Sequence, residues 1–190
     1  MAPAARIVPL NGARRPPRVR YSAAMPTNHQ QLYRHNRWAN RLLFEACRDL
    51  TAEQLAATCV GTYGPLGRTL AHLAVAEAGY VHRLSDEPRV LAWREPAPPP
   101  PMAELAAAME LSGARLIGLA TSTADDRIVE FTSLDGEEVR VPGWVLLVQS
   151  IDHAREHRTH AATILTQLGI APPDMDVWTF DASGAGAADD

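Results

Sequence analysis

Apolar residues recur at helical spacing over four long stretches of the chain. The first stretch begins at Thr27, a residue type that is common at helix N-caps, and Thr51 starts a short further helical piece. Glycine and proline residues separate the stretches, which is where loops are expected. The four predicted helices cover, approximately, residues 27–50, 69–85, 102–120 and 143–168.

The period changes from helical to alternating between the third and fourth stretches. Residues 128–131 and 138–141 flank Asp135-Gly136, a dipeptide that favours a tight hairpin turn. Pro142 is expected to end the second strand. The pattern as a whole therefore predicts an all-α fold, a four-helix bundle with a small β-hairpin before the last helix.

The two ends of the chain lack this periodicity. Residues 1–24 hold five Arg, four Pro and no acid, so they are expected to form a disordered basic extension. Two interpretations of this segment stay open: translation begins at Met25, or the segment is a basic tail that contacts an acidic partner. Residues 181–190 contain only Ala, Gly, Ser and Asp and are expected to be a disordered tail. The folded domain is thus predicted to span residues 25–180.

Composition narrows the class of protein. Apolar residues make up 46% and charged residues 21%, which is ordinary for a soluble domain. The formal charge of −4 argues against a nucleic-acid binder. The chain has neither an apolar run of the roughly 18 residues that a membrane span needs nor a secretory signal, so we expect a cytoplasmic protein without a membrane partner. All 18 basic residues are Arg, which excludes lysine Schiff-base chemistry.

Three of the seven histidines lie in the last predicted helix. Taking His153 as zero, His157 falls at about +40° and His160 at about −20°, on an apolar stripe with Leu146 and Ile164. Buried imidazoles lose their hydration and would repel each other if charged. A shared metal ion resolves both costs, because a neutral imidazole offers it a lone pair. The i, i+4 spacing of His153 and His157 therefore predicts a pair of metal ligands.

A third ligand must come from another element, and His72 is the best candidate. It shares one side of its helix with Ala76 and Gly79, whose small size would permit close approach of another helix. The alternative is an exposed or packed histidine that binds nothing. Near the pair, Asp152 and Glu156 are candidates to accept the second ring N–H of a ligand, or else they lie on a solvated face beside arginines.

The remaining histidines and the cysteines show no spacing typical of a site. His29, His35 and His82 are expected at the surface or at helix caps. Cys47 and Cys59 form no CxxC pair and are expected to be small buried side chains.

Three motifs and the end of the domain resemble a known family. The matching stretches are Tyr33–Asn40 (YRHNRWAN), Thr69–Leu73 (TLAHL), His153–Arg158 (HAREHR) and Gly169–Trp178 (GIAPPDMDVW). In this order and at this spacing, residues 25–180 resemble the DinB-like (YfiT-like) metalloenzyme superfamily.

The resemblance implies a four-helix bundle, often dimeric, with zinc or nickel held by His72, His153 and His157. The family often has Gln near the place of His160, so a histidine there is either an additional ligand or a pocket residue. Relatives include thiol-dependent S-transferases and a mycothiol-dependent maleylpyruvate isomerase.

We therefore expect a metal-dependent enzyme with a small-molecule substrate, either a hydrolase or a transferase that uses a low-molecular-weight thiol. Arg158 would bind a carboxylate of such a thiol, or else form a surface salt bridge. The competing hypothesis is a non-catalytic, metal-stabilised binding or stress-response protein, which His160 as a fourth ligand would favour. Metal binding is expected to weaken below about pH 6, where unperturbed imidazoles take up protons.

The helix predicted at 69–85 is apolar nearly all round, which has two explanations. One is that this helix also covers a partner, so we expect a homodimer. The other is that the helix is central in the bundle.

Overall fold

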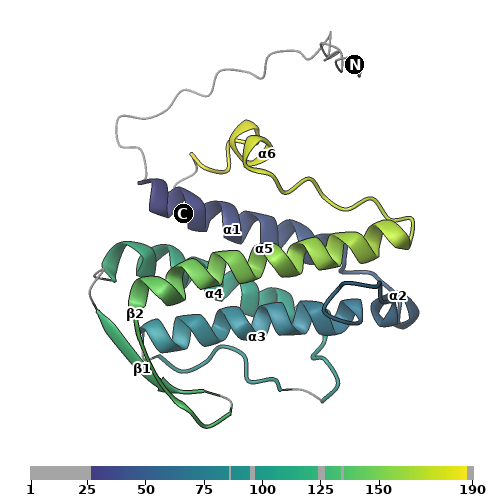
Figure 1. Ribbon diagram of the computed structural model, residues 1–190. Helices are drawn as coiled ribbons and strands as arrows, with labels where there is room; N and C mark the ends of the chain where they lie inside the picture. Colours follow the sequence, from purple (N-terminus) through teal and green to yellow (C-terminus); the bar gives the residue numbers. More distant parts are fainter. Residues whose placement is uncertain (1–26, 86, 95–96, 124–126, 134, 188–190) are drawn as a thin grey trace, which may run out of the picture.

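The computed structural model describes residues 27–85, 87–94, 97–123, 127–133 and 135–187. The extension predicted at 1–24 and the last part of the predicted tail, 188–190, lie outside these residues. Within the described part, four long helices form a bundle and a two-stranded hairpin precedes the last of them (Figure 1), which confirms the predicted fold class. The elements are α1 (Asn28–Ala46), α2 (Ala52–Ala56), α3 (Leu66–Ser85), α4 (Met102–Ser122), β1 (Ile128–Thr132), β2 (Glu138–Pro142), α5 (Gly143–Gln167) and α6 (Val177–Ala182). None of the described helices is long and apolar enough to cross a membrane.

Helices α1 and α2 each begin with a capping box. The Thr27 hydroxyl accepts from the backbone N–H of Gln30 (3.2 Å), and the Gln30 side chain accepts from the backbone N–H of Thr27 (2.9 Å). Thr51 and Gln54 repeat this arrangement at the start of α2. The predicted N-caps are therefore confirmed, but α1 ends at Ala46 rather than near residue 50, since the chain must turn before the second box.

The start of α3 differs from the prediction, which began this helix near residue 69. The helix begins at Leu66, so Gly67 is a helical residue. A Cβ atom at Gly67 would lie 3.4 Å from the Leu55 carbonyl oxygen, so glycine lets α3 pack closely against α2.

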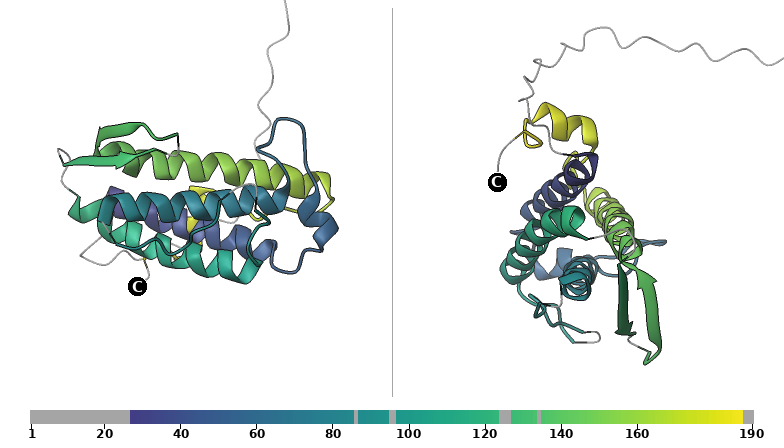
Figure 2. Two further views of the ribbon diagram at one scale, coloured as in Figure 1. Left: turned by 90° about the horizontal axis from the view of Figure 1, so that it is seen from below. Right: turned by 90° about the vertical axis from the view of Figure 1, so that its left-hand side faces the viewer.

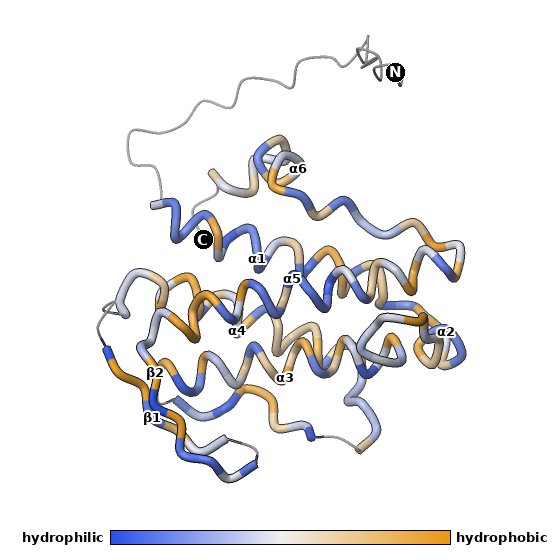
Figure 3. Tube along the Cα trace, viewed as in Figure 1, coloured by the Kyte–Doolittle hydropathy of each residue, from blue (hydrophilic) through white to orange (hydrophobic). Residues whose placement is uncertain are grey.

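Helix α3 is the central element of the bundle. It packs against α4 and α5, and also contacts α2 and β1 (Figure 2). Its small residues Ala71, Ala74 and Ala78 are all buried. Colouring by hydropathy shows apolar residues recurring along the long helices and in both strands (Figure 3). The bundle thus buries most of the apolar surface of α3, which agrees with the alternative interpretation that this helix is central in the bundle. The homodimer stays a prediction.

The hairpin forms where it was predicted. β1 and β2 pair antiparallel, with Val129 opposite Val141 and Glu130 opposite Arg140. Gly136 adopts a φ of 85°, a left-handed conformation that favours glycine in such turns.

The C-terminal segment folds back onto α1. A ring nitrogen of His35, Nε2, donates to the Met175 carbonyl oxygen (2.8 Å), and the Gln31 side chain donates to the Gly186 carbonyl oxygen (3.0 Å). His35 is therefore a half-buried tether, which corrects its expected surface or cap position. Residues 181–187, which were assigned to a disordered tail, instead complete α6 and continue into turns against α1.

A buried polar network links α1, α3 and α5. From α5, Arg158 Nη1 donates to the side-chain oxygens of Asn36 (2.6 Å) and Asn40 (2.7 Å) on α1. Both asparagine amides donate to Oε2 of Glu77 on α3, each at 3.0 Å. All four residues are buried. Arg158 is thus an internal structural residue, which corrects both expectations for it, the surface salt bridge and the ligand for a substrate carboxylate.

Burial also sets the protonation of Glu77. Loss of hydration raises the pKa of its carboxyl to about 7, although the Asn36 hydrogen bond, the Arg158 charge and the Asn40 hydrogen bond oppose this. The folded protein therefore favours the protonated, neutral form of the Glu77 carboxyl group.

Replacing Glu77 by Gln tests this, because the variant keeps the shape of the side chain but does not titrate. A carboxyl whose pKa is higher in the folded state stabilises the protein below its unfolded pKa, near 4.5, and loses this contribution as the pH rises towards 7. Between pH 4.5 and 7, the unfolding free energy of the wild type should fall by roughly 2–3 kcal/mol relative to Glu77→Gln in urea titrations. Parallel curves for the two proteins would contradict the assignment, and exposed Glu53→Gln controls for loss of a carboxyl group.

Candidate metal centre

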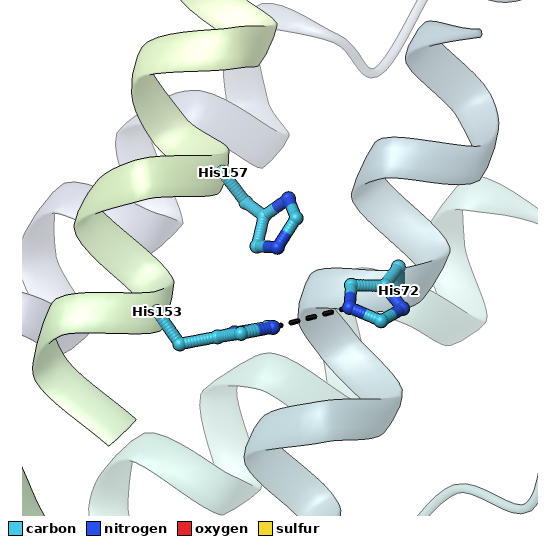
Figure 4. A group of neighbouring side chains, drawn as sticks. All are labelled: His72, His153 and His157. Atoms are coloured by element: carbon cyan, nitrogen blue, oxygen red, sulfur yellow. Dashed lines mark hydrogen bonds between the residues drawn. The ribbon is translucent and has the colours of Figure 1, made fainter. Parts of the chain in front are cut away.

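Three imidazoles from α3 and α5 converge inside the bundle (Figure 4). His72 comes from α3 and His153 and His157 from α5, and each offers one nitrogen within 4.8 Å of the others. The Nε2 atoms of His72 and His153 are 3.1 Å apart, and the ring centres of His153 and His157 are 4.3 Å apart. The structure thus brings together the three histidines that the sequence singled out.

Small residues allow the two helices to approach closely enough for this. Ala71 and Ala74 of α3 belong to the same buried cluster as Ala154 and Ala161 of α5. Because residues four apart lie on one face of a helix, His153 and His157 both project from the side of α5 that faces α3.

Burial keeps the imidazoles of His153 and His157 neutral. Burial lowers the pKa of His153 to about 4, with a further contribution from the neighbouring His72. Burial likewise lowers the pKa of His157 to about 4, reinforced by His153, His72 and His160. Near pH 7 both rings therefore carry lone pairs, the form that binds a metal ion.

Tyr63 holds the ring of His72 in place. Its hydroxyl oxygen lies 2.9 Å from His72 Nδ1, and the two rings stack with centres 4.2 Å apart. When Nδ1–H donates to this oxygen, Nε2 of His72 keeps its lone pair and directs it towards His153. The sequence pattern did not point to Tyr63, because it lies in the glycine-rich loop before α3 and has no helical spacing to His72.

The donor set fits a divalent metal ion. Two nitrogens bound at about 2.0–2.1 Å to a tetrahedral ion are about 3.3 Å apart, close to the 3.1 Å between His72 and His153. Three neutral imidazoles are ligands that transition-metal ions of borderline softness accept. The group can therefore hold such an ion.

The other predicted site residues lie around the group rather than in it. The His160 ring is 5.4 Å from that of His157, and among the described residues nothing hydrogen-bonds to its buried Nδ1. The Asp152 carboxylate pairs with Arg155 (3.1 Å), as the alternative interpretation held, and Glu156 is exposed. His157 Nδ1 is likewise buried without a described partner, so neither carboxylate fixes its tautomer.

The remaining histidines and the cysteines take no part in the group. His29 is exposed, and His82 Nδ1 donates to the Glu87 carbonyl oxygen (2.6 Å) just beyond α3, as expected for surface and cap residues. Cys47 is buried and Cys59 half-buried, and both are free. Burial raises the pKa of the Cys47 thiol to about 12, which makes it a poor nucleophile or ligand.

A cavity of about 700 Å³ opens beside the histidines, and His72 and His153 form part of its wall. This volume is typical of pockets for small organic ligands. Ala76 and Gly79 also line it. Ala76 therefore leaves space beside the histidines, while His72 on the same side of α3 faces His153 of α5, as expected for a ligand that meets another helix.

Known proteins similar to this chain agree with this architecture. The family model described as "DinB family" matches residues 25–186. Among solved structures, a DinB-like protein from Bacillus cereus ATCC 10987 superposes with a TM-score of 0.60 at 17% sequence identity, covering 77% of this chain and 94% of that one. At this identity the likeness shows a shared fold. No curated protein matches the chain.

Removal of one imidazole should release the metal, because it deletes a bond to the ion and leaves only two ligands. His72→Ala, His153→Ala and His157→Ala should each lose most of the metal that the wild type retains after dialysis, as measured by elemental analysis. The exposed control His29→Ala should keep full occupancy. Full retention in the His153→Ala/His157→Ala double variant would show that the ion binds elsewhere. If His160→Ala loses the metal, His160 is a fourth ligand.

The lowered pKa values also change the expected acid limit of binding. Protons compete with the metal only as the pH approaches the pKa of the ligands, which for His153 and His157 is about 4 rather than 6.5. Occupancy after dialysis at stepped pH should therefore persist at pH 5.5 and fall towards pH 4. A loss centred near pH 6 would mean that the imidazoles titrate as if exposed.

Proposed function

The chain belongs to the DinB family, and from this premise we propose that it is a metal-dependent enzyme that acts on a small molecule. In this proposal His72, His153 and His157 hold a divalent ion, zinc or nickel. The likeness in fold and the group of three converging imidazoles both support it.

The observation that carries the proposal is the position of the group at the wall of a cavity. Structural zinc sites are usually closed by four protein ligands, whereas catalytic sites keep a position open for water or substrate. The group found among the described residues offers three histidines, two of which line the 700 Å³ cavity. This arrangement favours a catalytic role over a purely structural one.

The chain's own side chains then perform distinct tasks. The three histidines would hold the ion, and a Tyr63 oxygen that accepts from His72 Nδ1–H would leave Nε2 of His72 free to bind it. The apolar side chains of Val75 and Leu146 in the cavity wall exclude water from part of the site. A divalent ion bound there supplies a Lewis acid that lowers the pKa of a coordinated water or thiol.

Two reactions fit this chemistry. In hydrolysis, the oxygen of water forms a bond to an electrophilic carbon of the substrate, the leaving group departs with the electron pair, and the water proton passes to the leaving group or to solvent. In thiol transfer, the sulfur of a low-molecular-weight thiol forms the new bond to that carbon, the leaving group departs with the electron pair, and the thiol proton passes to solvent. The second reaction follows the family resemblance, and the cavity offers room for the electrophile beside His72 and His153.

Activity should depend on both the metal and the cavity. Zinc- or nickel-loaded protein should turn over p-nitrophenyl acetate, or couple a thiol such as L-cysteine to monochlorobimane, and His153→Ala/His157→Ala should reduce the rate at least about 100-fold. Ala76→Phe fills the cavity without removing a ligand, so it should lower the rate while metal content stays unchanged. The matched control is Ala107→Phe on the exposed side of α4.

The same series separates the competing proposal of a non-catalytic protein. If loss of the metal lowers the melting temperature but Ala76→Phe and the wild type show equal rates at background level, the ion is structural.

A further inference from the structure

Two arginines meet in the cavity at a distance from the histidines. Arg83 of α3 and Arg89 of the following segment both line the cavity. A Cβ atom at Gly79 would lie 2.9 Å from Arg83 Nη1 and 3.9 Å from Arg89 Nη1. Both guanidinium groups therefore gather over Gly79, in space that exists because this residue has no side chain.

The ordinary role of a basic residue at a helix end does not account for Arg83. Arg83 lies in the last turn of α3, where a cation usually faces the unpaired carbonyls. Its guanidinium instead lies one turn back, over Gly79, with its carbon 4.5 Å from the centre of the Phe131 ring. It therefore points into the cavity rather than towards the end of the helix.

The charges of the two arginines are not balanced by acids in the described part of the chain. The ion pairs there involve other arginines, and neither Arg83 nor Arg89 has a carboxylate partner. Glu87, two residues before Arg89, pairs with Arg115 instead (3.0 Å). Burial lowers the pKa of Arg83, and so does the charge of Arg89. Two half-buried guanidinium groups held together in this way attract an anion.

The position of Arg89 is fixed by the segment that follows it. Leu91 and Trp93 are buried in the core, and Trp93 Nε1 donates to the Pro98 carbonyl oxygen (2.9 Å). The backbone that carries Arg89 is thus anchored within a few residues.

The cavity extends along one face of α3, from His72 at the metal centre to Gly79 beneath the two arginines. Gly79 is seven residues beyond His72, a separation of about 10 Å along a helix that rises about 1.5 Å per residue. Ala76 lies between them, and Leu146 and Phe131 add apolar surface to the wall. A molecule that reaches from the arginines to the histidines therefore has an anionic end, an apolar middle and a reactive end.

We propose that this cavity binds an organic anion, whose oxyanion lies between Arg83 and Arg89 and whose apolar body extends towards His72 and His153. The inference rests on the proposed function, because it makes this anion the substrate of the metal centre. It sets the class of substrate: an elongated molecule with a carboxylate or phosphate at the end remote from the reacting group.

Calorimetric titration of the metal-loaded full chain with 4-phenylbutyrate tests the proposal. The uncharged 4-phenylbutyramide has nearly the same shape, so it should bind at least about tenfold more weakly. Arg83→Gln and Arg89→Gln should each weaken carboxylate binding at least about tenfold and leave amide binding unchanged. Arg48→Gln, which removes an exposed arginine that does not line the cavity, should leave both affinities unchanged.

A second series separates this inference from the metal site. The His153→Ala/His157→Ala variant should still bind 4-phenylbutyrate, even if the proposed enzymatic activity proves wrong. Comparison with 4-phenylbutyl phosphate identifies the oxyanion, since the preferred one should lose more affinity in the two arginine variants. Should Arg83→Gln melt at a lower temperature, Arg89→Gln carries the test, because Arg89 lies outside the helices.

Two results would overturn the proposal. One is equal affinity for the carboxylate and the amide. The other is carboxylate binding that survives both arginine substitutions but is lost in the histidine double variant, which would place the anion on the metal.

Discussion

The guanidinium of Arg158 is buried in the centre of the bundle, and the rest of the structure depends on its being satisfied there. An unpaired charge in such a place would cost several kcal/mol. The side-chain oxygens of Asn36 and Asn40 accept from the guanidinium, and both asparagine amides donate in turn to Glu77. These contacts fix the rotation and register of α5 against α1 and α3. His157 is the residue before Arg158, and its direction towards α3 follows from this setting.

Local pattern predicted the helices, the caps, the hairpin and the histidine pair, because each is set by residues a few positions apart. What it could not predict depends on distant contacts. Arg158 was expected either to bind a carboxylate of the thiol or to form a surface salt bridge, but its partners Asn40 and Asn36 are 118 and 122 residues away in the sequence. Tyr63 and the return of the C-terminal segment to His35 likewise depend on the assembled bundle.

The two ends of the cavity, which extends along α3, differ in charge. Its end near His72 includes the neutral imidazole of His153, and its end near Gly79 has two cations that no described acid neutralises. Between the two ends, Ala76 contributes almost no side-chain volume, and Gly79 contributes none beneath the arginines. Residues that looked suited to helix packing thus give the metal centre its access and the arginines their space.

The central claim is an open metal centre built from three histidines. X-ray absorption spectroscopy of the zinc-loaded full chain tests it most directly, because it counts the ligands. The account predicts three imidazole nitrogens at about 2.0–2.1 Å and one exchangeable light atom, which added thiol replaces with sulfur at about 2.3 Å. A shell of four protein ligands that added thiol leaves unchanged would contradict it.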